Sequence, residues 1–92
     1  MKGSDRMFSA ALRVLRGETF EAVAGDYGVT PVRIRQMLDK AVRVTDPDLS
    51  MAYFWQSSRQ RRKGRRWIDL LRADADVLIP LVEAKMKEIG DD

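Results

Sequence analysis

The sequence predicts an all-α fold, a compact bundle of about five helices. Three observations support this prediction. Apolar residues recur three or four positions apart, Gly and Pro separate the segments that show this spacing, and no segment alternates polar and apolar residues as a strand does. With 92 residues, 45% of them hydrophobic, the chain has material for one core and not for two. We therefore expect a single domain over residues 1–92.

Two helices are expected at the N-terminal end. The first spans about 5–16, and Ser4 can serve as its N-cap. The second is short, 20–27, with Thr19 as N-cap and Gly28 as its stop, because the left-handed residue that ends a helix is usually glycine. The residues expected to face the core from these helices are Met7, Phe8, Ala11, Leu12, Leu15, Phe20, Val23 and Ala24.

Two further helices begin with the same signal, a capping side chain followed by proline. Thr-Pro at 30–31 starts a helix of about 31–43, and Asp-Pro at 46–47 starts one that reaches about residue 62. Proline suits the first helical position because its missing N–H would have no partner there. Residues 51–55 are apolar around more than a full turn, which indicates a segment enclosed on several sides or one at a subunit contact.

The remaining apolar residues predict helix to the C-terminal end. Pro80 should kink or split this helix, since its ring removes one backbone hydrogen bond and clashes with the carbonyl of Asp76. We expect one segment from about Trp67 and another that begins near 76–79. Trp55 and Trp67 both lie in apolar helical patterns, so we assign them to the core rather than to stacking on unpaired bases.

The composition excludes most metal sites and most acid–base mechanisms. The chain has neither cysteine nor histidine, the commonest ligands and proton-transfer groups of such sites. Four carboxylates lie among Lys and Arg and are interpreted as a solvated surface: Asp69, Asp74, Asp76 and Glu83. No apolar run has the length of a membrane span or the position of a signal peptide. We expect no enzyme, cofactor, metal or membrane contact, and a cytoplasmic, nucleoid-associated protein of bacterial or phage type.

Positive charge is concentrated in one stretch, although the net charge is only +3. Residues 59–72 carry seven Lys or Arg and one Asp, whereas 73–92 carry two Lys and six Asp or Glu. Six cations fall within 59–66, which we call the basic run: Arg59, Arg61, Arg62, Lys63, Arg65 and Arg66. We interpret it as a phosphate contact, either along the backbone or as an arm that bends at Gly64 into the minor groove. The alternative is a cationic loop that matters only for solubility.

The segment 23–37 carries the strongest functional signal. A helix-turn-helix needs a small residue where its helices cross, a Gly in the turn, and apolar residues that lock the second helix onto the first. Ala24 and Gly28 meet the first two needs. The apolar set comprises Val29, Ile34 and Met37. The residues left toward solvent or DNA are Thr30, Val32, Arg33, Arg35, Gln36, Asp39, Lys40 and Arg43. The alternative is a plain helical hairpin in a small bundle.

From 11 to 44 the chain also resembles the fourth conserved region of bacterial primary sigma factors. The recognition helix of that family is typically Val-Ser/Thr-Arg-Glu-Arg-Val-Arg-Gln-Ile, and residues 29–37 are Val-Thr-Pro-Val-Arg-Ile-Arg-Gln-Met. The family's Arg-Glu pair is replaced here by Pro-Val at 31–32, so its promoter specificity does not carry over. Since the chain has no room for the regions that bind core polymerase, the resemblance points to a small transcription regulator, not a full sigma factor.

The resemblance assigns roles to the predicted recognition helix. It implies that Arg33 and Gln36 approach base edges in the major groove, while Arg35 and Lys40 hold phosphates. Together with the basic run, these features predict a DNA-binding transcriptional regulator that reads the major groove of double-stranded DNA with residues 31–43.

Partners other than DNA are also suggested. Residues 1–45 would form the helix-turn-helix part, and 46–92 would supply the basic run, the C-terminal helices and a partner contact. The excess of apolar residues at 51–55 and 77–82 suggests a homodimer. A rival function is a protein-binding module that inhibits RNA polymerase or another nucleic-acid machine through the acidic end, 74–92. A third function, RNA binding, would use the basic run alone.

Overall fold

The computed structural model describes residues 3–90, and this range folds into six α-helices and one 3₁₀ turn without any strand. The helices are α1 (Gly3–Leu15), α2 (Phe20–Tyr27), α3 (Pro31–Thr45), α4 (Pro47–Gln60), α5 (Trp67–Ala73) and α6 (Ala75–Gly90), and the 3₁₀ turn η1 (Arg61–Lys63) follows α4. The all-α class is therefore confirmed, with one helix more than predicted. The start of α1 differs, because Ser4 lies inside the helix and is not its N-cap.

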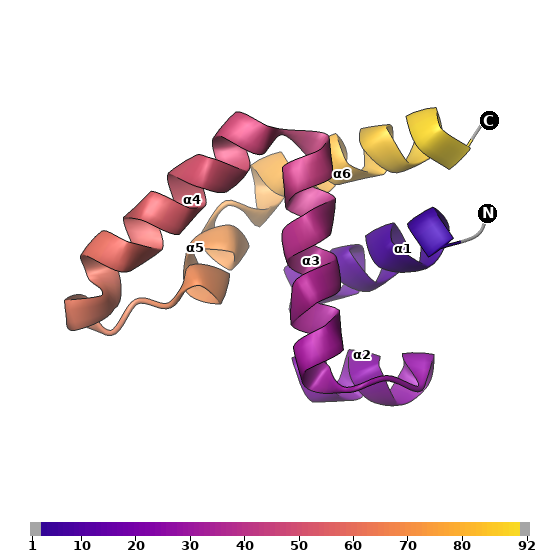
Figure 1. Cartoon of the computed structure of the whole chain (residues 1–92), viewed down its shortest axis with the longest axis horizontal. Coiled ribbons are helices and arrows are strands. Elements are labelled where there is room, and N and C mark those ends of the chain that lie inside the picture. The colour runs from indigo at the N-terminus through magenta and orange to yellow at the C-terminus, as the bar shows by residue number, and fades with distance from the viewer. Residues whose placement is uncertain (1–2, 91–92) are drawn as a thin grey trace.

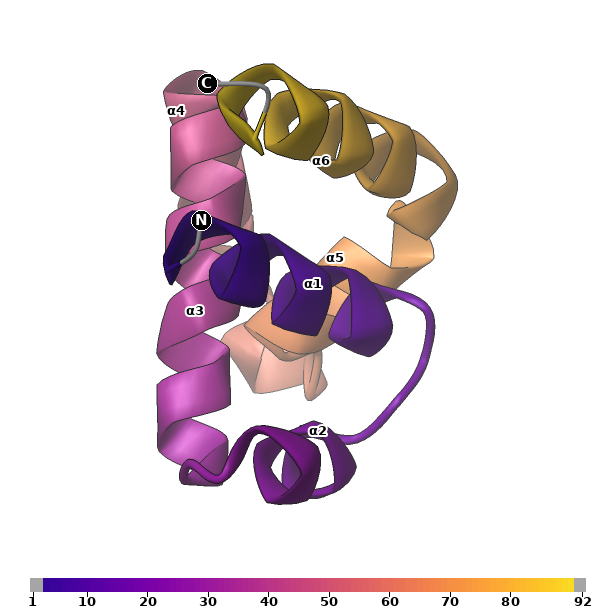
Figure 2. The same cartoon turned by 90° about the vertical axis from the view of Figure 1, so that its right-hand side faces the viewer.

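Helix α3 stands at the centre of the molecule and contacts α1, α2, α4 and α6. Helices α1 and α6 lie side by side against it, while α2 crosses its N-terminal end (Figure 1). Helices α4 and α5 pack together on the side of α3 that faces away from α1. The view turned by 90° shows α1 lying between α2 and α6 (Figure 2). This arrangement leaves one long side of α3 without a covering helix.

The core lies between α3 and the helices around it. The burial of each large apolar side chain in this core stabilises the fold by roughly 1.5–3 kcal/mol. The largest fully buried side chains are Phe8, Val14, Val23, Ile34, Leu38, Val42, Leu71, Leu78 and Val82. The predicted core residues of the first two helices agree with this, except that Met7 and Phe20 are only partly buried.

The C-terminal segment is split as expected, with α5 starting at Trp67 and α6 starting at Ala75, one residue before the expected range of 76–79. The break lies at Asp74, and Pro80 does not interrupt α6. The Asp74 carbonyl accepts hydrogen bonds from the N–H groups of Val77 and Leu78, both at 2.9 Å, and so starts α6. The side chain of Asp74 accepts a hydrogen bond of 2.6 Å from the Tyr53 hydroxyl on α4. This contact links the break to α4, 21 residues earlier in the chain. Pro80 is accommodated inside α6, which loses the backbone hydrogen bond that proline cannot donate.

The apolar segment 51–55 of α4 is not enclosed by other helices, so the first of the two interpretations of its sequence is wrong. Only Tyr53 is buried, whereas Met51, Phe54 and Trp55 are 55%, 56% and 56% exposed. The assignment of Trp55 to the core is therefore wrong. Trp67 is partly buried and does pack against the core. Burial raises the pKa of the Tyr53 hydroxyl, and its hydrogen bond to Asp74 raises it further.

Replacing Gly28 by Val is expected to lower the free energy of unfolding by about 1–2 kcal/mol. Gly28 has φ +68°, a left-handed conformation that a β-branched residue adopts only with strain, and a Cβ there would otherwise meet nothing. Gly25→Ala is the matched control: this glycine lies within α2 in open space, so Ala should stabilise the helix by about 0.5–1 kcal/mol. Equal melting temperatures for the Gly28 variant and the wild type would contradict the prediction.

Candidate nucleic-acid interface

The turn between α2 and α3 is built by two residues that act locally, Gly28 and Thr30. Gly28 adopts the left-handed conformation, with its N–H bonded to the Ala24 carbonyl, and ends α2. The Thr30 hydroxyl then accepts a hydrogen bond of 3.2 Å from the N–H of Arg33 and caps α3. Thr19 caps α2 in the same way through the N–H of Ala22. The bounds predicted for α2 are confirmed, and α3 runs two residues further than predicted.

One face of α3 is buried and the opposite face is open. The buried residues are Ile34, Leu38, Ala41 and Val42. The exposed residues are Thr30, Val32, Arg33, Arg35, Gln36, Lys40 and Arg43, and Asp39 is half-buried. Val32, near the start of the helix, is 65% exposed, the largest value among the exposed large hydrophobic residues described. The open face thus offers cations, an amide and the apolar side chains of Val32 and Val44.

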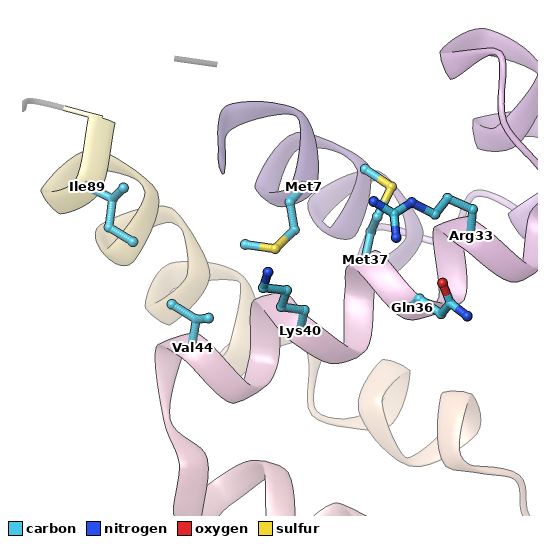
Figure 3. A pocket seen from close by; sticks show the side chains of 7 residues that line it. All are labelled: Met7, Arg33, Gln36, Met37, Lys40, Val44 and Ile89. Atoms are coloured by element: carbon cyan, nitrogen blue, oxygen red, sulfur yellow. The ribbon is translucent and has the colours of Figure 1, made fainter. Parts of the chain in front are cut away.

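A groove of about 420 Å³ runs along one edge of this face. Three of the predicted site residues line it from α3, namely Arg33, Gln36 and Lys40 (Figure 3). Apolar side chains from three helices complete its wall: Met7 from α1, Met37 and Val44 from α3, and Ile89 from α6. Sequence reasoning did not place Met7, Val44 or Ile89 at the site, because their positions relative to α3 depend on the packing of α1 and α6.

The other edge of α3 meets the basic run. Arg35 lines a groove of about 260 Å³ together with Arg61, Arg65 and Arg66. A neighbouring groove of about 300 Å³ again contains Arg35 and Arg61. The guanidinium carbon of Arg35 lies 5.0 Å from the centre of the Trp67 ring, close enough for a cation–π contact. Two separate predicted sites therefore meet at Arg35.

The basic run turns back on itself at Gly64. This glycine has φ +78° and donates its N–H to the Arg61 carbonyl at 3.0 Å. Arg65 follows, and its side chain donates to the Gln60 amide oxygen at 3.2 Å. All six cations of the run are exposed. The run is thus a turn that joins α4 to α5. An arm that bends at Gly64 into the minor groove stays a prediction.

Most cations of the candidate interface have no carboxylate partner among the described residues. Within that range only two of them form ion pairs, Arg43 with Asp39 and Arg66 with Asp69, each at 3.4 Å. Hydrogen bonds from the backbone and the side chain of Arg66 hold the pKa of Asp69 below its usual range. The cations without an ion pair to any side chain that the structure describes are Arg33, Arg35, Lys40, Arg59, Arg61, Arg62, Lys63 and Arg65.

Two arginines outside the candidate interface stabilise the fold instead. Arg13 forms ion pairs of 2.6 Å with both Glu18 and Asp26, and its hydrogen bond to Glu18 is the main reason that the pKa of this carboxyl is lowered. Arg72 on α5 donates hydrogen bonds to the backbone carbonyls of Val14 and Glu18, and so connects α5 with the C-terminal end of α1 and the residues after it. These arginines are committed to intramolecular contacts, unlike those of the basic run.

The four carboxylates considered in the sequence, Asp69, Asp74, Asp76 and Glu83, do not gather into a site. Asp74 accepts a hydrogen bond from Tyr53, and Glu83 forms an ion pair of 2.6 Å with Arg16, which directly follows α1. No group of three or more possible metal ligands occurs among the residues whose positions are described. Within residues 3–90, no helix is both long and apolar enough to cross a membrane.

Comparison with known proteins returned no match: no family model, no curated protein and no solved structure corresponds to this chain. The resemblance to the sigma-factor region therefore stays a prediction from the residues of 29–37. Any function has to be argued from the side chains of the interface itself.

Proposed function

We propose that this protein is a DNA-binding transcriptional regulator that places α3 in the major groove of double-stranded DNA. The observation that carries the proposal is the meeting of the open face of α3 with the basic run at Arg35 and Arg61. A surface of this kind presents many cations over a short distance, and few of them are neutralised by carboxylates. A polyanion is the partner that such a surface fits.

The dimensions of α3 agree with this role. An α-helix with its side chains is about 10–12 Å wide, and the major groove of B-DNA is about 12 Å wide. The open face offers Arg33 to guanine and Gln36 to adenine, in the bidentate pairings that read base edges. Val32 is exposed where an apolar contact to a thymine methyl group would be made.

Phosphate contacts would flank the base contacts on both sides. Lys40 and Arg43 lie further along α3, and Arg35 joins the helix to the basic run. The Thr30 hydroxyl accepts its capping hydrogen bond from Arg33, so its own hydrogen remains to donate to a phosphate oxygen. Contacts of this type fix the orientation of the helix on DNA and carry no sequence information.

The structure offers less support for the rival function, inhibition of a nucleic-acid machine through the acidic end. Two of the acidic side chains there, Asp74 and Glu83, are engaged by Tyr53 and Arg16 within the chain. A third, Glu88, forms an ion pair with Lys85. The acidic end is thus partly neutralised internally, whereas most cations of the candidate interface have no ion pair with a described side chain.

The proposal is tested by a mobility shift on random duplex DNA at several salt concentrations. We expect retention at low salt and a plot of log K against log salt with a slope of roughly −4 to −7, the value for five to eight phosphate contacts. A single-stranded RNA of equal length serves as the control. No retention of duplex at low salt would contradict DNA binding, and tighter binding of the RNA would favour recognition through the basic run alone.

A further inference from the structure

The outer face of α4 is apolar and has no partner within the described part of the chain. Met51, Phe54 and Trp55 lie three and four residues apart, so they form one stripe on the side of α4 opposite to the buried Tyr53. More than half of each side chain is exposed. Phe54 and Trp55 contact each other edge to face, with ring centres 5.6 Å apart. A stripe of this kind gains free energy when a partner covers it.

Charged residues of opposite sign lie at the two ends of this stripe. Asp48 precedes Trp55 by seven residues, and Arg59 follows Asp48 by eleven, so all three lie on the same side of the helix. Arg62 continues the line one turn later, in η1. Between Asp48 and Arg59 there is no charged residue. The stripe is therefore acidic at its start, apolar in its middle and basic at its end.

The two arginines at the end of the stripe are separate from those that line the grooves beside α3. Arg61, Arg65 and Arg66 line the groove that contains Arg35, and neither Arg59 nor Arg62 does so. Arg59 and Arg62 are exposed and form no ion pair with a described side chain. Arg59 and Arg62 thus lie apart from these grooves, although Phe54 of the stripe borders the second groove with Arg35 and Arg61.

We propose that the α4 stripe is a homodimer interface in which α4 pairs antiparallel with α4 of a second copy. The order of charges selects this occupant, because an antiparallel copy brings the acidic start of one stripe to the basic end of the other. A parallel pair would set Asp48 beside Asp48 and Arg59 beside Arg59. The inference goes beyond the proposed DNA binding and does not depend on it.

The spacing along the helix sets the register. With the two-fold axis between Phe54 and Trp55, Met51 of one copy is level with Ser58 of the other. Asp48 is then level with residue 61 of the second copy, within about 3 Å along the axis of both Arg59 and Arg62 at a rise of 1.5 Å per residue. The aromatic side chains meet at the centre, where they exclude water.

Sedimentation equilibrium of the full chain tests the interface. We expect the mean mass to rise from one chain toward two with concentration, and Trp55→Glu to remain a monomer with unchanged helix content, because this side chain is exposed in the single chain. Val77→Glu is the matched control, since Val77 is 59% exposed on α6 and lies outside the stripe. Loss of the dimer in the Val77 variant and not in the Trp55 variant would place the interface on α6 and overturn the proposal.

Disulfide cross-linking tests the relative orientation of the two α4 helices. Single cysteines can be introduced without interference because the chain has none of its own. Met51→Cys and Ser58→Cys are prepared separately, mixed and oxidised. The antiparallel register predicts a mixed disulfide between positions 51 and 58 and little cross-linking of either variant alone. Cross-linking of each variant alone, without the mixed product, would indicate a parallel pair and overturn the proposal. A wild-type chain that stays monomeric at every concentration would also overturn the proposal. The same holds if the monomer binds anionic vesicles through this stripe.

Discussion

Leu38→Ala is expected to lower the free energy of unfolding by about 2–5 kcal/mol, measured by chemical denaturation. Leu38 is fully buried on the inner face of α3, the helix that contacts α1, α2, α4 and α6. Removing its side chain leaves a cavity that the surrounding helices can close only in part. Since many small domains are stable by only about 5–15 kcal/mol, this variant is expected to show a clearly lower melting temperature.

Gln36→Ala is the control for this measurement. Gln36 lies two residues before Leu38 on the same helix, and its side chain is exposed on the opposite face. We expect its stability to stay within about 0.5 kcal/mol of the wild type. If both variants were equally stable, the assignment of the buried and open faces of α3 would be wrong, and with it the surface proposed to contact DNA.

The start and end of α2 and the start of α3 follow from residues close in sequence. Thr19 and Thr30 cap helices through N–H groups three residues away, and Gly28 supplies the left-handed turn. Such signals act over one turn of helix, so the sequence alone is enough to locate these boundaries. The buried and open faces of α3 were predicted for a similar reason, because the 3.6-residue period fixes which residues share a face.

Long-range contacts were not predicted, even where the helix boundary beside them was. The break at Asp74 is coupled to Tyr53, 21 residues earlier in the chain. Trp55 was assigned to the core because it lies in an apolar helical pattern, yet such a pattern does not tell which face of α4 is covered by another helix. That helix packs on α3 and α5, and Met51, Phe54 and Trp55 stay more than half exposed.

The candidate interface likewise combines parts that local sequence predicts with contacts that it does not predict. The sequence identified the cations of α3 and of the basic run as two separate features. Their approach at Arg35 depends on how α4 folds back beside α3, and no local pattern encodes this. The stacking of Arg35 on Trp67 joins residues 32 positions apart and was not foreseen. Composition and periodicity can therefore suggest the parts of a site, but the packing of the helices decides whether the parts meet.

Contacts that read bases and contacts that hold phosphates should respond differently to substitution. Gln36 is uncharged, so its contribution to DNA binding must come from directed hydrogen bonds to base edges. Gln36→Ala is expected to weaken binding to a preferred site, selected from a random pool, by about 1–3 kcal/mol, and binding to random duplex much less. The measurement is a mobility shift of both duplexes with the same protein preparation.

Arg61→Ala combined with Arg65→Ala should act on both duplexes alike. These side chains line the groove with Arg35, where a phosphate rather than a base edge would be contacted. Two lost phosphate contacts should flatten the plot of log K against log salt by about two while the ratio of specific to random binding is kept. If the double variant instead abolished sequence preference and Gln36→Ala left it intact, bases would be read by the basic run, and the assignment of α3 as the recognition helix would be wrong.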